Sequence, residues 1–218
     1  MASRPLLPLF PLLTVLFPGN VQPLHIFEER YKLMVRRCRE SDGMMGVVAI
    51  RRGDEVGMTA EPYDVGTLAR ITRIDALSEG RINLTVVGER RFRITQLNDE
   101  EPYLRGEVEI ISDDAVTVAP EAISAIREGY VDYIRLLRRL AQRTERVVRV
   151  PDETLELSYV IAARLHISRL EQQGLLEASV DNRLRLERDI LRRELALLRR
   201  LGAVSTRRTR SSPEITPN

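Results

Sequence analysis

One histidine and one glutamate near the amino terminus have the residue types of an acid–base pair. His25 precedes Glu28 by three residues, and an imidazole held by a carboxylate can act as a general base. No nucleophile is fixed near this pair in the sequence, so the pattern favours a hydrogen-bonded structural role for His25. His166 is the only other histidine, and the histidine and cysteine spacings match no zinc site. The sequence therefore predicts no catalytic residue and no metal or cofactor site.

The single cysteine has cationic neighbours that could make it reactive. Cys38 lies between Arg37 and Arg39, and nearby positive charge lowers the pKa of a thiol. Adjacent residues of a helix face different directions, however, and a lone helical cysteine is typical of a small core residue. We therefore expect Cys38 to lie in the core. The chain has no second cysteine with which to form an internal disulfide.

Arginines are concentrated near the carboxyl end of the sequence. The segment from Arg183 to Arg210 holds ten arginines against three acidic residues, whereas the whole chain has a formal net charge of +2. Clustered cations bind nucleic acid by releasing phosphate counterions, so an RNA- or DNA-binding protein is the alternative function. Aromatic residues make up only 5% of the chain, and no strand combines exposed rings with cations as base-stacking surfaces do. The sequence favours a solvated basic face, and nucleic acid is not the expected partner.

The composition is that of a globular protein, with 43% hydrophobic and 30% charged residues among 218. Pro5, Pro8 and Pro11 interrupt any signal-peptide helix, and no window approaches about 18 uninterrupted apolar residues. A G-x-x-x-x-G-K-[ST] phosphate-binding loop is also missing from the sequence. We expect a cytoplasmic protein without a membrane partner.

The amino-terminal half has the period of short strands joined by turn residues. Prolines limit ladder hydrogen bonds, so the strand around Pro8 and Pro11 is expected at a sheet edge or at the rim of a barrel. Pro18-Gly19 predicts a tight turn, and Gly88 is expected to separate two strands. Such short strands favour a closed or nearly closed β structure. The expected elements are a helix that starts near residue 26 and strands at 44–50, 66–77, 82–86, 90–94 and 104–111.

The period becomes helical in the carboxyl-terminal half. Apolar residues recur at steps of three and four, which is typical of amphipathic helices. Asp181 is a candidate cap before the last helix, and the polar stretch from Gly202 has no apolar periodicity and should be disordered. The expected helices are 123–140, 151–165, 170–177 and 182–201.

The last of these helices has an apolar surface over half its circumference, which is wider than one neighbour usually needs. The surface divides into two stripes, with Glu187 and Glu194 between them. Both stripes could pack into the helix's own bundle. Alternatively, the second stripe meets another chain, either a homodimer partner or a client protein. The first stripe is Leu184, Leu191, Leu195 and Leu198, and the second is Leu186, Ile190, Leu197 and Leu201.

The opening of the chain resembles a known family. The runs Pro8–Leu12, Phe17–Gly19 and Pro23–Tyr31 are similar to the start of the Lon amino-terminal domain, the substrate-binding module of ATP-dependent Lon proteases. The usual Asp-Gly-Arg turn of the family is Glu79-Gly80-Arg81 here. Further matching segments extend the resemblance over residues 5–201; they are Val65–Ala69, Gly88–Ile94, Gln173–Glu177 and Arg183–Leu184.

This resemblance implies an α+β fold: a PUA-like twisted β pseudo-barrel with the first helix packed across it, followed by an α-helical bundle. We expect a Lon amino-terminal-like β domain at residues 1–117, a helical subdomain at 118–203 and a disordered tail at 204–218.

The resemblance also implies a function. It indicates a non-catalytic protein-recognition module, without the ATPase and peptidase modules, that binds exposed or unfolded segments of client proteins or peptides. The expected partners are clients, a separate protease or ATPase, and a second copy of the chain through the last helix. The sequence assigns no contact residues. Met44 and Met45 are adaptable side chains that either a client surface or a buried strand would explain.

Overall fold

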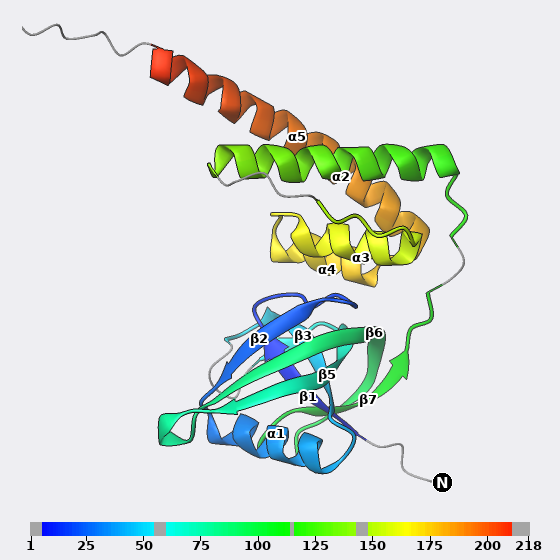
Figure 1. Ribbon diagram of the computed structural model, residues 1–218. Coiled ribbons are helices and arrows are strands. Elements are labelled where there is room, and N and C mark those ends of the chain that lie inside the picture. The colour runs from blue at the N-terminus through cyan, green and yellow to red at the C-terminus, as the bar shows by residue number, and fades with distance from the viewer. Residues whose placement is uncertain (1–5, 55–59, 114–115, 143–147, 211–218) are drawn as a thin grey trace, which may run out of the picture.

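The computed structural model describes residues 6–54, 60–113, 116–142 and 148–210, and for 202–210 it describes the backbone alone. The first half of the chain forms a β part, and helices α2 to α5 lie on one side of it (Figure 1). Helix α1 (Glu29–Glu40) covers the opposite side. The α+β architecture that the resemblance implies is confirmed.

The strands described in the β part form one closed ring with two additions. The hydrogen-bonded order β1-β7-β6-β5-β3 returns to β1, because β1 also pairs with β3. The β1–β3 pair is parallel, and the others are antiparallel. Outside this ring, β2 pairs with β6 and β4 pairs with β3. The strands are β1 (Leu7–Leu12), β2 (Val21–Ile26), β3 (Met44–Arg52), β4 (Glu61–Pro62), β5 (Val65–Ala76), β6 (Ile82–Asn98) and β7 (Arg105–Ile110).

Of the two places expected for β1, a sheet edge is excluded because β1 pairs on both sides, and the strand instead lies within the closed ring. Its prolines are tolerated because neither missing N–H would have a partner. The Leu9 N–H donates to the Leu104 carbonyl at 2.8 Å, toward β7. Alternation along the strand then turns the nitrogen of Pro8 toward β3 and that of Pro11 toward β7. Pairing with β3 begins only at Leu9, and pairing with β7 ends at Pro8.

The prediction of two strands separated by Gly88 is also wrong, because β6 runs unbroken through this residue. Arg90 opposes Leu68, whereas Gly88 opposes the next residue of β5, so Glu89 forms a bulge. A Cβ on Gly88 would lie 2.5 Å from the carbonyl oxygen of Phe17. Glycine is therefore needed here for a close backbone approach, not for a strand end.

The four helices expected in the second half are present as α2 (Pro120–Leu140), α3 (Thr154–Arg164), α4 (Arg169–Glu177) and α5 (Val180–Arg210). Helix α4 begins with a capping box: the Glu171 N–H donates to the Ser168 hydroxyl at 3.2 Å, and the Ser168 N–H donates to the Glu171 carboxylate at 3.0 Å. None of the helices within the described ranges has both the length and the apolarity to cross a membrane.

Asp181 does not cap α5 as predicted, because it lies within the first turn of the helix. Its carboxylate instead accepts hydrogen bonds from the Thr117 hydroxyl and, at 3.0 Å, from the Thr117 N–H. These bonds hold the segment that follows β7 against the start of α5. They also lower the pKa of Asp181.

Helix α5 continues to Arg210, past its predicted end at Leu201. Glycine within a helix costs about 1 kcal/mol relative to alanine, which is too little for Gly202 to end this helix. The prediction of disorder from residue 204 therefore differs from the helical backbone at 204–210. Its remainder, 211–218, lies outside the described residues.

A buried ionic cluster joins the β part to the helices. Arg91 of β6 is 2% exposed and donates to the Asp113 carboxylate at 2.6 Å. It also donates to the carbonyls of Leu176 and Ala178, each at 2.7 Å. The Tyr159 hydroxyl of α3 donates to the same carboxylate at 2.6 Å. Burial raises the pKa of Tyr159 to about 12, so this hydroxyl keeps its proton at neutral pH.

One hydrophobic cluster also spans both parts of the molecule. It contains Val15, Phe17 and Val65 from the β part and Tyr130 from α2. The Gln173 side chain of α4 adds a hydrogen bond to the Val65 carbonyl at 3.0 Å. Packing is continuous between the two parts of the molecule. The expected boundary between a β domain and a helical subdomain at residue 117 stays a proposal.

Candidate functional site

Strand β2 has one edge that no described strand covers. Among the described strands, it pairs only with β6. The Asn20 carbonyl accepts from the Gly88 N–H of β6 at 2.9 Å. By alternation, the backbone groups of Val21, Pro23 and His25 then point away from β6. This edge offers two N–H donors, because proline has none.

An apolar groove of about 350 Å³ lies along β2, between this strand and the end of β1. Its lining includes every residue from Gln22 to Glu28. Phe10 and Tyr31 line it with buried rings whose centroids are 4.5 Å apart. Leu24, which also lines it, belongs to the same core cluster. The groove therefore joins an open strand edge to part of the hydrophobic core.

Phe27 places an exposed apolar ring at the groove, and two further exposed apolar residues are close to lining residues in the sequence. Phe27 lines the groove and is 49% exposed. Leu13 and Val21, each next in sequence to a lining residue, are 45% and 61% exposed. Phe27 therefore offers apolar surface that a partner seated in the groove would bury.

A second hollow of about 150 Å³ shares Pro11 and Tyr31 with the groove and so extends it. Tyr103, which precedes β7, is 3% exposed and forms part of its wall. Glu101 lines it too and pairs with Arg37 of α1 at 2.6 Å. The groove is mostly apolar, whereas the second hollow also has charged lining residues, among them Arg30 and Glu101.

The groove does not bring together a catalytic pair. The His25 Nδ1 is hydrogen-bonded to the Asn83 Oδ1 at 2.8 Å, as expected for a structural histidine. Glu28 instead accepts from Arg30 at 3.0 Å. His166 lies far along the chain, after α3. Within the described part of the chain, no three histidine, cysteine or acidic side chains are arranged to hold a metal.

The other side chains considered from the sequence are buried. Cys38 is 2% exposed, and burial raises the pKa of its thiol to about 11. A thiol that keeps its proton at neutral pH is a poor nucleophile, so the core prediction for Cys38 is confirmed. Met44 and Met45 are 8% and 0% exposed in β3, so the buried strand explains them and a client surface does not.

Helix α5 buries its first apolar stripe and exposes most of the second. Leu184 and Leu191 are at most 2% exposed, which confirms the prediction that this stripe packs in its own bundle. Leu186, Leu197 and Leu201 are 45%, 48% and 62% exposed. The second stripe is therefore a further open apolar surface.

Sequence reasoning misses the groove, although β2 carries a signal for it. Leu24 and Ile26 point into the core, while Val21 and Phe27 give the outer face an apolar character as well. A strand with apolar residues on both faces is covered on both faces or has one face available to a partner.

Comparison with known proteins supplies the family. The model of the ATP-dependent protease La (LON) substrate-binding domain matches residues 6–193. Lon protease 2 of Myxococcus xanthus is 30% identical over 199 residues, which cover 88% of this chain and 24% of that protein. The Lon protease of Anaeromyxobacter dehalogenans is 29% identical with the same two coverages. The chain thus spans 24% of the length of these curated relatives.

Two solved structures are similar in fold. The Lon N-terminal domain protein from Xanthomonas campestris has a TM-score of 0.61 and 29% identity, over 84% of this chain and 96% of that one. The N-terminal domain of the Mycobacterium avium complex Lon protease also has a TM-score of 0.61, with 19% identity, over 86% and 98%. Since the family model covers most of the sequence, the chain belongs to the LON substrate-binding domain family.

Proposed function

We propose that this chain is a non-catalytic recognition module that binds exposed, extended segments of client proteins in the groove along β2. The observation that carries the proposal is the free backbone edge of β2 beside an apolar groove. The family's description as a substrate-binding domain supports it. Delivery of the bound client to a separate protease or ATPase is part of the same proposal.

An extended client segment would add to β2 as a further strand. The N–H and carbonyl groups of Val21 and His25 would exchange hydrogen bonds with the backbone of the segment. Each such bond contributes about 0.5–1.5 kcal/mol net and is independent of the client sequence. This mode of binding explains how one surface can accept many clients.

Selectivity for unfolded chains would come from the side chains of the segment. Alternate side chains of an extended segment point to one side, so every second one would enter the hollow over Phe10 and Tyr31. Phe27 on the rim would be buried by the same contact. Folded proteins hide such runs of alternating apolar residues in their cores, whereas unfolded ones expose them.

Substitution of Phe27 tests this function. Fluorescence anisotropy would measure the binding of labelled decapeptides with leucine at every second position. Phe27→Ser should weaken binding about fivefold, because less apolar surface is buried. The matched control is Leu97→Ser, since Leu97 is 45% exposed on β6 and lines neither hollow. An unchanged affinity for Phe27→Ser, or an equal loss in both variants, would contradict binding in the groove.

We also propose that a second copy of the chain covers the exposed stripe of α5. The stripe runs from Leu186 to Leu201, about 22 Å along the helix, and a two-fold axis would pair it with itself. Sedimentation equilibrium would test the proposal, with Leu197→Glu lowering the dimer fraction and Leu97→Glu leaving it unchanged. A chain that stays monomeric up to millimolar concentration would exclude the dimer.

A further inference from the structure

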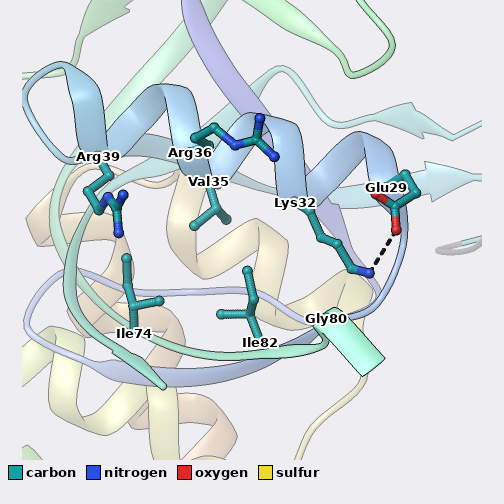
Figure 2. A pocket seen from close by; sticks show the side chains of 8 residues that line it. All are labelled: Glu29, Lys32, Val35, Arg36, Arg39, Ile74, Gly80 and Ile82. Atoms are coloured by element: carbon teal, nitrogen blue, oxygen red, sulfur yellow. Dashed lines mark hydrogen bonds and ion pairs between the residues drawn. The ribbon is translucent and has the colours of Figure 1, made fainter. Parts of the chain in front are cut away.

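Helix α1 and the β5–β6 hairpin enclose a pocket that is separate from the β2 groove. Its volume is about 420 Å³, and it shares no lining residue with the groove. Figure 2 shows Ile74 and Ile82 of the hairpin on one side, facing the basic side chains of α1. The hairpin turns at Gly80, whose φ of +67° is readily adopted only by glycine.

The α1 wall of the pocket is cationic. Lys32, Arg36 and Arg39 follow one another at steps of four and three, so they share one face of the helix. Lys32 pairs with Glu29 at 2.8 Å, and its Nζ lies 3.5 Å from the position that a Cβ on Gly80 would take. Within the part of the chain that the structure describes, the side chains of Arg36 and Arg39 form no hydrogen bond or ion pair. Two guanidinium groups are therefore available to an anion.

The floor of this pocket is aliphatic. Val35 is 2% exposed, and it belongs to one core cluster against which Ile74 and Ile82 pack. None of the lining residues is aromatic, so the pocket has no ring on which a nucleic base could stack. A guanidinium group binds a carboxylate through two parallel hydrogen bonds. The arrangement fits a ligand that carries an aliphatic group between carboxylates.

We propose that this pocket binds an acidic peptide segment of another protein. An aliphatic side chain of the segment would lie over Ile74 and Ile82, and flanking aspartates or glutamates would pair with Arg36 and Arg39. The inference does not rest on the β2 groove, because the two surfaces share no lining residue. The pocket would recognise charged segments, whereas the groove would recognise extended apolar segments.

A labelled peptide in which two glutamates flank a single leucine on each side would test the proposal by anisotropy at low salt. The double substitution Arg36→Gln, Arg39→Gln should weaken its binding about tenfold. The charge-matched control is Arg90→Gln, Arg93→Gln, at exposed positions of β6 outside the pocket; it should change the affinity less than twofold. Thermal unfolding of each variant would show that the fold is kept.

Further arms of this experiment separate the pocket from general charge attraction. Replacing the leucine of the peptide by serine should weaken binding about fivefold, through loss of the contact with the aliphatic floor. The proposal would be overturned if the two double arginine variants lost the same affinity for the peptide. It would also be overturned if replacing the leucine of the peptide left its affinity unchanged. Tighter binding of labelled RNA or of anionic lipid vesicles through Arg36 and Arg39 would overturn it as well. Phe27→Ser should leave the binding of the acidic peptide unchanged. The proposal for the groove and the proposal for the pocket can therefore fail independently of each other.

Discussion

The β part and the helical part of the molecule place their polar groups in different surroundings. The β part leaves groups open at its surface: β2 has a free backbone edge, and Arg36 and Arg39 are exposed beside a pocket. The helical part and its junction bury charge instead, since Arg183 is 0% exposed and Arg91 2%. Buried charges fix one packing arrangement, because leaving them unpaired is costly. We infer that the open groups of the β part are available to clients and that the buried groups hold the helical part against it.

Glu187 is a buried ionisable side chain of the helical part, with 0% of its surface exposed. Neither of its carboxylate oxygens has a hydrogen-bond partner among the described residues. Burial raises the pKa of this carboxyl well above its ordinary value, although Arg183, one turn earlier, acts in the opposite direction. The folded environment therefore favours the protonated form of Glu187 more than water does.

Loss of Arg91 should have the largest effect on stability. Arg91→Met leaves the Asp113 carboxylate and the Leu176 and Ala178 carbonyls without this donor, and breaking a buried ion pair costs about 3–5 kcal/mol. Urea unfolding would measure the change. Arg93→Met, an exposed position two residues further along β6, should change the free energy of unfolding by less than about 0.5 kcal/mol. A small effect at both positions would mean that the junction does not stabilise the fold.

Removal of the Glu187 charge should have a smaller, stabilising effect. The pKa of this carboxyl is higher in the folded chain than in the unfolded one, so stability falls as the pH rises above the ordinary glutamate pKa toward the folded value. Glu187→Gln abolishes this titration and should raise the free energy of unfolding at pH 7. The gain should vanish near pH 4. Urea unfolding at both pH values checks this, and a loss of stability at pH 7 would show an ionised Glu187 paired with Arg183.

Salt should separate the two surfaces of the β part. Salt screens exposed charges. Raising sodium chloride from 50 to 500 mM should therefore weaken the binding of the acidic peptide about fivefold. The leucine-rich decapeptide binds by burying apolar surface, so its affinity should change less than about twofold. Anisotropy titrations at both salt concentrations measure this contrast. Equal salt dependence of the two peptides would show that they share one electrostatic site.

Local patterns in the sequence predict most of the elements, but not every strand pairing. The turn at Gly80 and the helical periods of α2 to α4 depend on nearby residues, and they are found close to where the sequence places them. The position of β1 depends on which neighbours pair around Pro8 and Pro11, and the sequence does not show this. The continuity of β6 depends in the same way on how closely Phe17 approaches Gly88.

The two surfaces could be predicted only in fragments. Lys32, Arg36 and Arg39 recur at helical spacing in the sequence. The isoleucines of the pocket belong to the β5–β6 hairpin, which β3 and β4 separate from α1 along the chain. The groove likewise joins Phe10 to Phe27 only once the ring of strands has closed. Surfaces built by long-range pairing are not readable from spacing alone.

Amide hydrogen exchange with and without the leucine-rich decapeptide tests the central claim most directly. If client segments add to β2, the N–H groups of Val21 and His25 should exchange more slowly in the presence of the peptide, because they gain hydrogen-bond partners. The amides of α5 should be unchanged. Protection confined to the exposed stripe of α5, with none at β2, would contradict the account.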